Sequence, residues 1–166
     1  MANVARILIL LTTMIVCVGC DQVTKSAARA HLYSGKALSL FLDFVRLQHV
    51  ENPGAFLSMG DSLPEPVRTM VFTFGGIVLV GGVMLWAARA RGLGNVQAVG
   101  VALICGGGLG NLIDRLTQGG YVTDFLNLGI GPLRTGIFNV ADFALLVGAG
   151  IFIFCSFSSA QTAAAG

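Results

Sequence analysis

Residues 92–113, GLGNVQAVGVALICGGGLGNLI, form a largely apolar run without a charged residue. A helix needs about 20 apolar residues to cross the hydrocarbon core of a bilayer, so this run is long enough to span a membrane. Residues 69–88 form a similar uncharged run, and residues 137–158 form another that contains one acid. The apolar run near the start of the chain is shorter, and its helix must continue through Asp21 to cross. We therefore expect four spans, at about residues 5–28, 69–88, 92–113 and 137–158.

The composition supports a membrane protein. Only 11% of the 166 residues are charged and 55% are hydrophobic, whereas a soluble domain carries roughly 25% charged residues. So few charges cannot cover the surface of a soluble domain, and so many apolar residues exclude a disordered chain. The net charge of +2, without a basic stripe, indicates no nucleic-acid partner. We expect a single integral membrane domain, residues 1–166.

The four cysteines show no metal-ligand spacing, and all lie in apolar runs. They are typical of small packing residues, and no metal site is expected. The sequence CVGC that ends at Cys20 loosely resembles the lipidation site of a bacterial lipoprotein precursor, which leaves a lipoprotein anchored through Cys20 as an alternative. The three spans that follow favour a helix that runs on past this cysteine.

Two outer loops, residues 29–68 and 114–136, are expected to connect the spans. Residues 40–50, LFLDFVRLQHV, alternate in part between apolar and polar side chains, and a turn signal follows them. The expected fold class is an all-α membrane protein with four transmembrane helices and a small β-rich extracytoplasmic element between the first two. Arg6, Arg89 and Arg91 lie at the other ends of the spans, and the positive-inside rule therefore predicts cytoplasmic termini.

Asp142 is an acid inside the last span. Aspartate within a span costs a few kcal/mol on insertion scales unless it faces protein or water. Asn139 lies three residues earlier, so we expect the two side chains to share a helix face. The functional interpretation is a reactive or binding carboxylate, and the alternative is an acid favoured by the helix N-terminus.

The third span ends in a glycine-rich segment with polar residues. Gly106 and Gly110 are spaced as in a GxxxG helix-packing pair. Asn111 and Arg115 are four residues apart and share a face, on which an arginine can bind carboxylates or peptide carbonyls. In the first span, Asp21 and Lys25 have the same spacing and are compatible with a structural ion pair.

Four segments together resemble the lipoprotein signal peptidases (signal peptidase II). The resemblance covers about residues 1–158 and depends on the order and spacing of four motifs. Residues 21–25 (DQVTK) fit D-x-x-[ST]-K, residues 110–115 (GNLIDR) fit G-N-x-x-D-R, residues 122–125 (VTDF) fit V-x-D-F, and residues 138–142 (FNVAD) fit F-N-x-A-D.

The resemblance implies an aspartic endopeptidase of the bacterial inner membrane, with its site near the extracytoplasmic face. Such an enzyme removes signal peptides from prolipoproteins by cleaving before the diacylglyceryl-modified cysteine. Asp124 and Asp142 would be the catalytic pair, and no metal or cofactor is required. The implied partners are lipid-modified prolipoproteins and membrane lipid, with no obligate protein partner. The substrate-binding or supporting residues would be Asp21, Lys25, Asn52, Gly54, Asn111, Asp114, Arg115 and Asn139.

The first outer loop departs from the family pattern N-x-G-x-A-F-[GS]. Residues 52–58 read NPGAFLS, so that Asn52 and Gly54 match while Phe56 stands one place early. The alternative to an enzyme is a small membrane carrier or assembly factor that uses Asp142 as an intramembrane acid. The second acid, Asp124 in its matching motif, favours the peptidase.

Overall fold

Four long helices and one small sheet make up the fold. The computed structural model describes the chain except for residues 1, 33–34, 55–59, 61, 91 and 165–166. In that part of the chain, four helical segments are long and apolar enough to cross a membrane: Val4–His31, Glu65–Arg89, Asn95–Thr117 and Val140–Phe157. The expected four spans and fold class are confirmed. Cys20 lies inside the first helix, as the helical interpretation of that segment requires.

Two helices begin or end at other residues than expected, because a proline or glycines determine those ends. The second span starts early because a proline-led turn begins it, and α2, a π-helical segment and α3 follow one another without a break. The third helix runs past residue 113 and ends before Gly119 and Gly120, whose φ values are positive. Asp114 and Arg115 therefore lie on a helix and not in an outer loop. The helices are α1 (Ala2–His31), α2 (Glu65–Arg68), the π-helical η2 (Thr69–Phe74), α3 (Gly75–Arg89), α4 (Asn95–Thr117) and α5 (Val140–Ala164).

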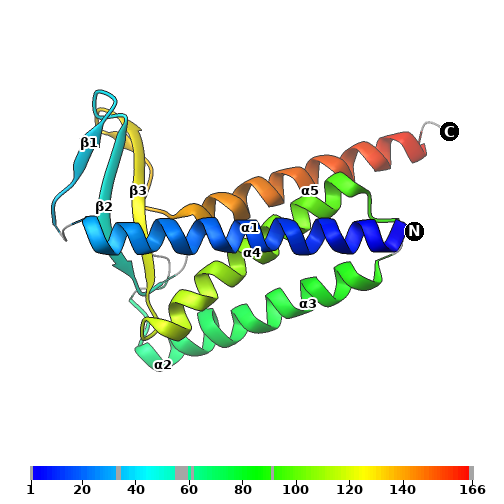
Figure 1. The fold of residues 1–166 in the computed structure, drawn as a ribbon, viewed down its shortest axis with the longest axis horizontal. Helices are drawn as coiled ribbons and strands as arrows, with labels where there is room; N and C mark the ends of the chain where they lie inside the picture. Colours follow the sequence, from blue (N-terminus) through cyan, green and yellow to red (C-terminus); the bar gives the residue numbers. More distant parts are fainter. Residues whose placement is uncertain (1, 33–34, 55–59, 61, 91, 165–166) are drawn as a thin grey trace.

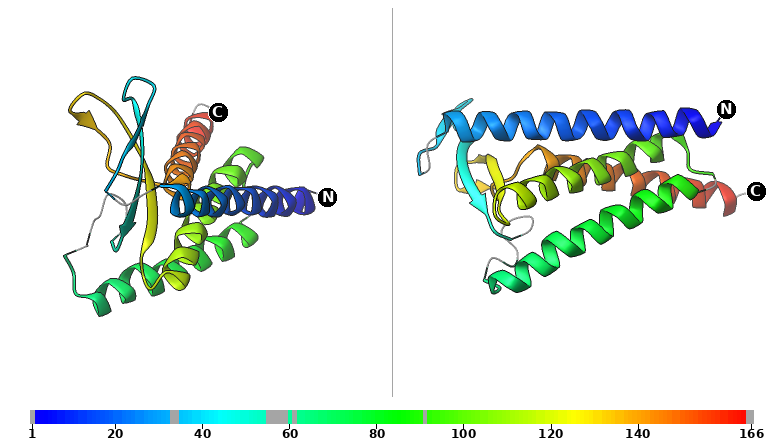
Figure 2. Two further views of the ribbon diagram at one scale, coloured as in Figure 1. Left: turned by 60° about the vertical axis from the view of Figure 1, so that its left-hand side comes forward. Right: turned by 60° about the horizontal axis from the view of Figure 1, so that its bottom comes forward.

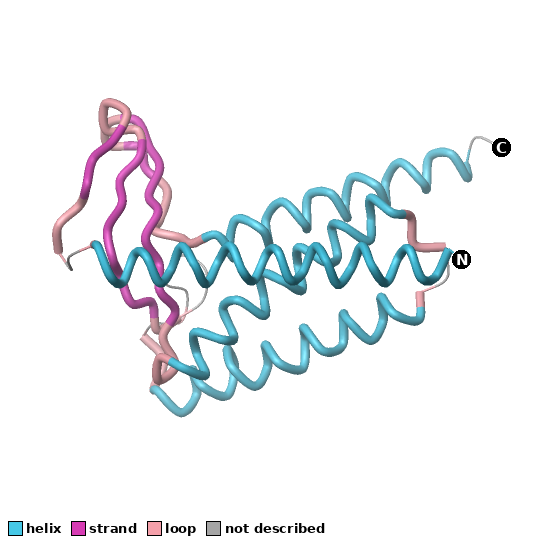
Figure 3. Tube along the Cα trace, in the orientation of Figure 1, coloured by secondary structure: helices cyan, strands magenta, loops and turns pink. Residues whose placement is uncertain are grey.

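The sheet takes strands from both loops. Its antiparallel order is β1 (Leu38–Leu40), β2 (Val45–Asn52), β3 (Val122–Ile130) and β4 (Leu133–Arg134). The strands expected between the first two spans are confirmed, whereas residues 114–136 were expected only as a loop. This loop forms β3 because β2 supplies hydrogen-bonding partners that its own sequence does not contain. The strands lie across one end of the helices, and both chain termini lie at the opposite end (Figures 1 and 3).

Charged residues lie at both the sheet end and the terminal end of the molecule. Asp43, Glu51 and Asp124 belong to the strands of the sheet or their turns, and Asp142 lies in the first turn of α5. Arg6 lies near the start of α1 and Arg89 ends α3, and these helix ends lie with the chain termini (Figure 2). The Arg6 guanidinium donates to the carbonyl of Ala90 (2.7 Å), which ties α1 to the short α3–α4 connection. Arg91 lies outside the described residues.

Glycines of α4 allow α1 and α5 to approach closely. A Cβ atom at Gly106 would lie 2.9 Å from the Cβ of Cys17, and one at Gly110 would lie 2.6 Å from Asp21 Oδ2, both on α1. The expected GxxxG packing role is thus confirmed. On another face of α4, a Cβ at Gly107 would collide with the carbonyl oxygen of Ala141 on α5.

A buried cation joins the elements that carry the polar residues. Lys25 is fully buried, and its Nζ lies 2.9 Å from Asp21 Oδ2 and 3.2 Å from Asp114 Oδ2, both also fully buried. The other oxygen of Asp21 accepts from the backbone N–H of Ala141 (2.9 Å), at the start of α5. Asp114 accepts from the backbone N–H of Thr123 (2.9 Å) on β3. The ion pair expected in α1 exists, and it connects α1, α4, α5 and β3.

Substituting Gly107 by alanine is expected to destabilise the protein by about 1–3 kcal/mol, because the backbone of α5 must move to admit the methyl group. Gly82→Ala is the matched control, since nothing lies within 4 Å of a Cβ at that position. Thermal unfolding in detergent measures both. Equal melting temperatures for the two variants would contradict the close α4–α5 contact.

Lys25→Met is expected to cost about 3–5 kcal/mol of stability, since it removes the buried cation that lies between two buried carboxylates. Lys36→Met removes an exposed lysine and should change stability by less than about 0.5 kcal/mol. Denaturation in detergent compares the two. A Lys25→Met variant as stable as the wild type would show that the buried cation does not hold the elements together.

Candidate active site

Asp124 and Asp142 meet at the junction of the sheet and the helices. Asp124 is on β3 and is 2% exposed, and Asp142 is in the first turn of α5 and is 6% exposed. Asn139 contacts both: its Nδ2 donates to Asp124 Oδ1 (2.6 Å) and its backbone N–H to Asp142 Oδ2 (3.3 Å). One residue therefore holds the two acids beside each other.

Asn139 is the cap of α5, and this corrects the expectation that it shares a helix face with Asp142. The helix begins at Val140. The Oδ1 of Asn139 accepts from the backbone N–H of Asp142 (2.9 Å), while Asp142 accepts from the backbone N–H of Asn139. This reciprocal pair is a capping box. Asp142 is thus the helix N-terminal acid of the alternative interpretation and also part of the acidic pair.

Two further side-chain amides donate hydrogen bonds to the carboxylates. Asn52 Nδ2 donates to Asp124 Oδ2 (2.8 Å), and Asn111 Nδ2 donates to Asp142 Oδ1 (2.8 Å). With the two bonds from Asn139, each of the four carboxylate oxygens accepts one N–H. These donors position both carboxylates, and none of them is an ion.

Lys25 determines which way the Asn111 amide points. Its Nζ donates to Asn111 Oδ1 (2.9 Å). An ammonium has no acceptor, so it requires the oxygen of the amide on its side and directs the amide N–H₂ toward Asp142. Lys25 therefore acts on the acidic pair through Asn111 and does not contact either acid of the pair.

The environment of Asp124 favours a bound proton. Burial raises the pKa of its carboxyl to about 6, and the amides of Asn52 and Asn139 act in the opposite direction. The nearby Asp142 also raises the pKa of Asp124, because two neighbouring carboxylates do not ionise together easily.

Arg115 joins the first outer loop to this site. Its guanidinium donates to the carbonyl of Gly54 (2.6 Å) and lies 5.9 Å from the ring centroid of Phe72. The backbone N–H of Gly54 in turn donates to Asn52 Oδ1 (2.9 Å). The predicted residues Asn52, Gly54 and Arg115 are thus brought together, while Phe56 lies outside the described residues.

The predicted residues form two layers. Asn52, Asn111 and Asn139 contact the acids directly. Asp21, Lys25 and Asp114 lie behind them and act through Asn111 and the backbones of β3 and α5. All ten predicted positions therefore lie in one connected cluster.

Three residues of this cluster were missed in the sequence. Gln22 Nε2 donates to Asp114 Oδ1 (3.1 Å) and to the carbonyl of Gly110 (3.1 Å). Arg29 donates to Thr123 Oγ1 (2.8 Å), and its guanidinium lies 3.8 Å from Asp114. Arg29 stands four residues after Lys25, and this spacing on one face of α1 was a usable signal. Thr123 gave none, because its contacts depend on where β3 lies.

Two grooves reach Asp142 from different sides. One lies between α3 and α4 and also exposes Asn111 and Arg115. The other lies between the sheet and α5. Its walls are mainly apolar and include Leu128, Phe138, Phe143 and Leu146. An extended chain with apolar groups can therefore reach the acidic pair.

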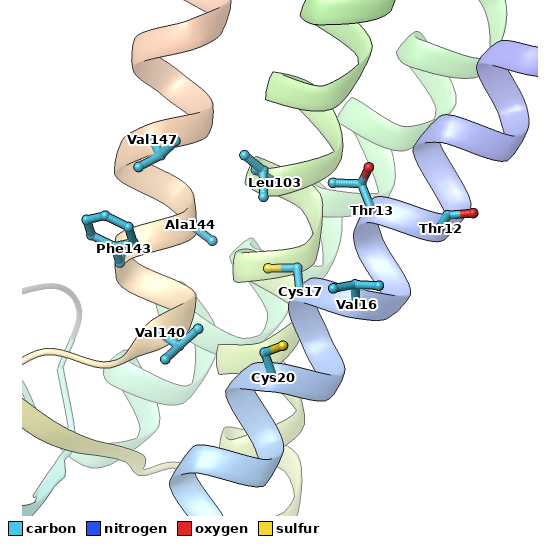
Figure 4. Close-up of a pocket in the computed structure, with 10 residues that line it drawn as sticks. All are labelled: Thr12, Thr13, Val16, Cys17, Cys20, Leu103, Val140, Phe143, Ala144 and Val147. Atoms are coloured by element: carbon cyan, nitrogen blue, oxygen red, sulfur yellow. The ribbon is translucent and has the colours of Figure 1, made fainter.

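A separate pocket between α1, α4 and α5 lacks these polar groups. Its walls include Cys17, Cys20 and Thr13 together with Phe143, and no acid or histidine (Figure 4). The described residues that line this pocket include no histidine or carboxylate that could activate either thiol as a nucleophile. In the described part of the chain, no group of three or more His, Cys, Asp or Glu residues is arranged to hold a metal ion.

Comparison with known proteins shows the family of the chain. A family model for signal peptidase (SPase) II matches residues 13–158. The lipoprotein signal peptidase of Sulfurihydrogenibium sp. is 33% identical over 150 residues, which cover 89% of this chain and 90% of that protein. That of Leifsonia xyli subsp. xyli is 35% identical over 152 residues, which cover 88% of this chain and 66% of that protein.

A solved bacterial membrane enzyme has the same fold, with a TM-score of 0.78 and 25% identity over 95% of this chain and 90% of that one. These matches confirm the resemblance that the four motifs indicated. They favour an enzyme over a carrier or assembly factor. The chain belongs to the signal peptidase II family, the lipoprotein signal peptidases.

Proposed function

We propose that Asp124 and Asp142 are the catalytic pair with which this lipoprotein signal peptidase cleaves signal peptides from prolipoproteins. The observation that carries the assignment is the buried pair itself. The two acids come from β3 and α5, and Asn139 bridges them. Every carboxylate oxygen of the pair accepts an N–H, and among the described residues no Lys or Arg side chain forms a salt bridge with either acid.

The geometry supports hydrolysis by water. Two neighbouring buried carboxyl groups share one proton. The ionised carboxylate takes a proton from water as the water oxygen attacks the scissile carbonyl carbon, while the protonated partner donates its proton to the carbonyl oxygen. The proton held by the pair then passes to the amide nitrogen, and as the carbon–nitrogen bond breaks, a hydroxyl of the tetrahedral intermediate returns its proton to the pair, which again holds one proton. The positioned amides keep both carboxyl groups in place through these steps.

The substrate proposed is a prolipoprotein with a diacylglyceryl-modified cysteine, cut just before that cysteine. Its signal peptide is apolar and its cysteine carries acyl chains. The two grooves at Asp142 offer apolar walls at the end of the membrane-spanning helices, where such a bond would lie.

The proposed location is the bacterial inner membrane, with the termini in the cytoplasm and the sheet on the extracytoplasmic side. Arg6 and Arg89 at the end with the termini support this orientation through the positive-inside rule. The acids gather at the other end, as the site of an extracytoplasmic peptidase requires.

Asp124→Asn and Asp142→Asn are each expected to lower cleavage at least about 100-fold, since each removes a carboxyl group that must exchange a proton. Glu51→Gln changes an exposed acid on β2 in the same way and should retain wild-type activity. A gel-shift assay on a diacylglyceryl-modified precursor measures cleavage, and thermal unfolding checks the fold. Full activity in either aspartate variant refutes the assignment.

The pH profile tests the shared proton. If the singly protonated pair is the active form, cleavage falls as pH rises through the pKa of Asp124, about 6, because the pair then loses its last proton. Asn52 donates to the ionised form and lowers this pKa. Asn52→Ala is therefore expected to move the alkaline limb of kcat/KM to higher pH. A limb that stays in place or moves to lower pH would contradict the role given to Asn52.

A further inference from the structure

We propose that a groove on the outer face of α3 binds one anionic phospholipid, at the end of the molecule where the chain termini lie. The Arg89 guanidinium binds the phosphate, and one acyl chain lies along Gly82, Leu85 and Trp86. The groove is remote from the acidic pair. Its role depends neither on which residues are catalytic nor on which side of the membrane the termini lie.

The groove has mainly apolar walls and one cation. Its walls are Gly82, Leu85, Trp86, Arg89 and Ala90, and its volume is about 360 Å³, which is within the range of roughly 300–1,000 Å³ typical of ligand pockets. From Gly82 to Arg89 the groove rises about 10 Å along the helix axis. Because Arg89 is the last residue of α3, the cation lies at the end of the groove nearest the membrane surface.

Gly82 leaves room for a chain on the outer face of α3. No described residue places an atom within 4 Å of a Cβ at this position, and Leu85 and Trp86 are 56% and 48% exposed. The opposite face of α3 is packed against protein, since Ala87 is buried in a core formed with α1 and α4. The groove therefore faces outward on a membrane-spanning helix, where its surroundings are lipid.

The Trp86 ring forms a fixed side of the groove. It packs edge-on against Phe152 of α5, with the ring centroids 5.8 Å apart and an angle of 81° between the ring planes. An indole combines a large apolar surface with one polar N–H, and tryptophan is enriched where a span meets the headgroups. Trp86 and Arg89 are three residues apart and share a helix face. Together they match the apolar and the charged part of a phospholipid.

The cation at the end of the groove has no counter-ion nearby. In the part of the chain that the structure describes, no acid or other acceptor pairs with Arg89. The acids of its own span and of the next helix lie at the far ends, because Glu65 begins the span that Arg89 ends and Asp114 is in the last turn of α4. Glu65 is about 36 Å away along the helix axis. The described residues therefore leave Arg89 to an external anion.

A second arginine makes this end of α3 more favourable for an anion. The free carbonyl groups at a helix C-terminus carry partial negative charge, which repels a phosphate. The Arg6 guanidinium donates to the carbonyl of Ala90 (2.7 Å), which borders the groove. Arg6 thus offsets part of the negative end of α3, and Arg89 meets the phosphate with less of this repulsion.

The ligand that fits these groups is a phospholipid with a net negative charge. A guanidinium binds two phosphate oxygens at once through its planar fork, and basic pockets at the ends of spans bind anionic head groups. Phosphatidylcholine carries the same phosphate but pairs it with its own quaternary ammonium. Arg89 therefore favours phosphatidylglycerol, which has no cation of its own.

Quenching of the single tryptophan tests the site, because Trp86 lines the groove. The full chain is reconstituted into vesicles of equal parts phosphatidylglycerol and phosphatidylcholine, without substrate. In one preparation only the phosphatidylglycerol has brominated acyl chains, and in the other only the phosphatidylcholine. Lipids that meet Trp86 at random quench its emission equally in the two preparations. A bound anionic lipid predicts at least about twofold stronger quenching by brominated phosphatidylglycerol.

Matched substitutions test whether the groove causes this preference. Arg89→Gln removes the cation and Gly82→Leu fills the space for the chain, so each is expected to bring the ratio of the two quenching values close to one. Arg68→Gln changes an arginine near the other end of the same span and should keep the wild-type ratio. Gly81→Leu should keep it too, since Gly81 does not line the groove and a Cβ there also meets no described atom within 4 Å.

Equal quenching in the two wild-type preparations would overturn the proposed lipid site, and so would a preference that survives Arg89→Gln. Added salt separates a lipid from a soluble anion. Sodium phosphate and sodium chloride at the same ionic strength should weaken the preference equally. A preference lost in phosphate alone indicates inorganic phosphate as the occupant, and that result also overturns the lipid site.

Discussion

The buried ammonium of Lys25 is the interaction on which the polar half of this molecule depends. Two carboxylates, Asp21 and Asp114, are buried with it, and neither is tolerable there without a cation. Their remaining lone pairs accept backbone N–H groups of α5 and β3. One charge in α1 thereby fixes where a helix from the end of the chain begins and where a strand from the second outer loop lies.

The same cation orders the acidic pair through neutral groups. Lys25 orients Asn111, and Asn111 with Asn52 and Asn139 supplies N–H donors to Asp124 and Asp142. A cation in direct contact would stabilise two ionised carboxylates and remove the shared proton. Amides position the carboxyl groups with less effect on their charge, and burial keeps the pKa of Asp124 raised. The separation of the charged layer from the neutral layer is therefore what makes a proton-sharing pair possible.

The sheet has a different role: it carries one of the two acids to the ends of the membrane-spanning helices. Asp124 lies on β3 opposite Val50 of β2 and is bonded to Asn139, the cap of α5. The position of the sheet relative to the helices is fixed by hydrogen bonds from β3 to Asp114 of α4 and from Asn139 to Asp124. A groove with mainly apolar walls between the sheet and α5 reaches Asp142.

The sequence by itself determined the four spans, the glycine contacts of α4 and the residues of the site, because hydrophobic length, small-residue spacing and motif order are local properties. It could not place Asn139, whose role as a cap appears only once α5 is seen to begin at Val140. Nor could it show that residues 122–130 form a strand, since their hydrogen-bonding partners lie in β2, far away in the chain. Tertiary structure alone decided that Thr123 joins the site and that Asn139 bridges two acids from β3 and α5. Contacts between distant segments depend on how helices and strands pack, and no local pattern records them.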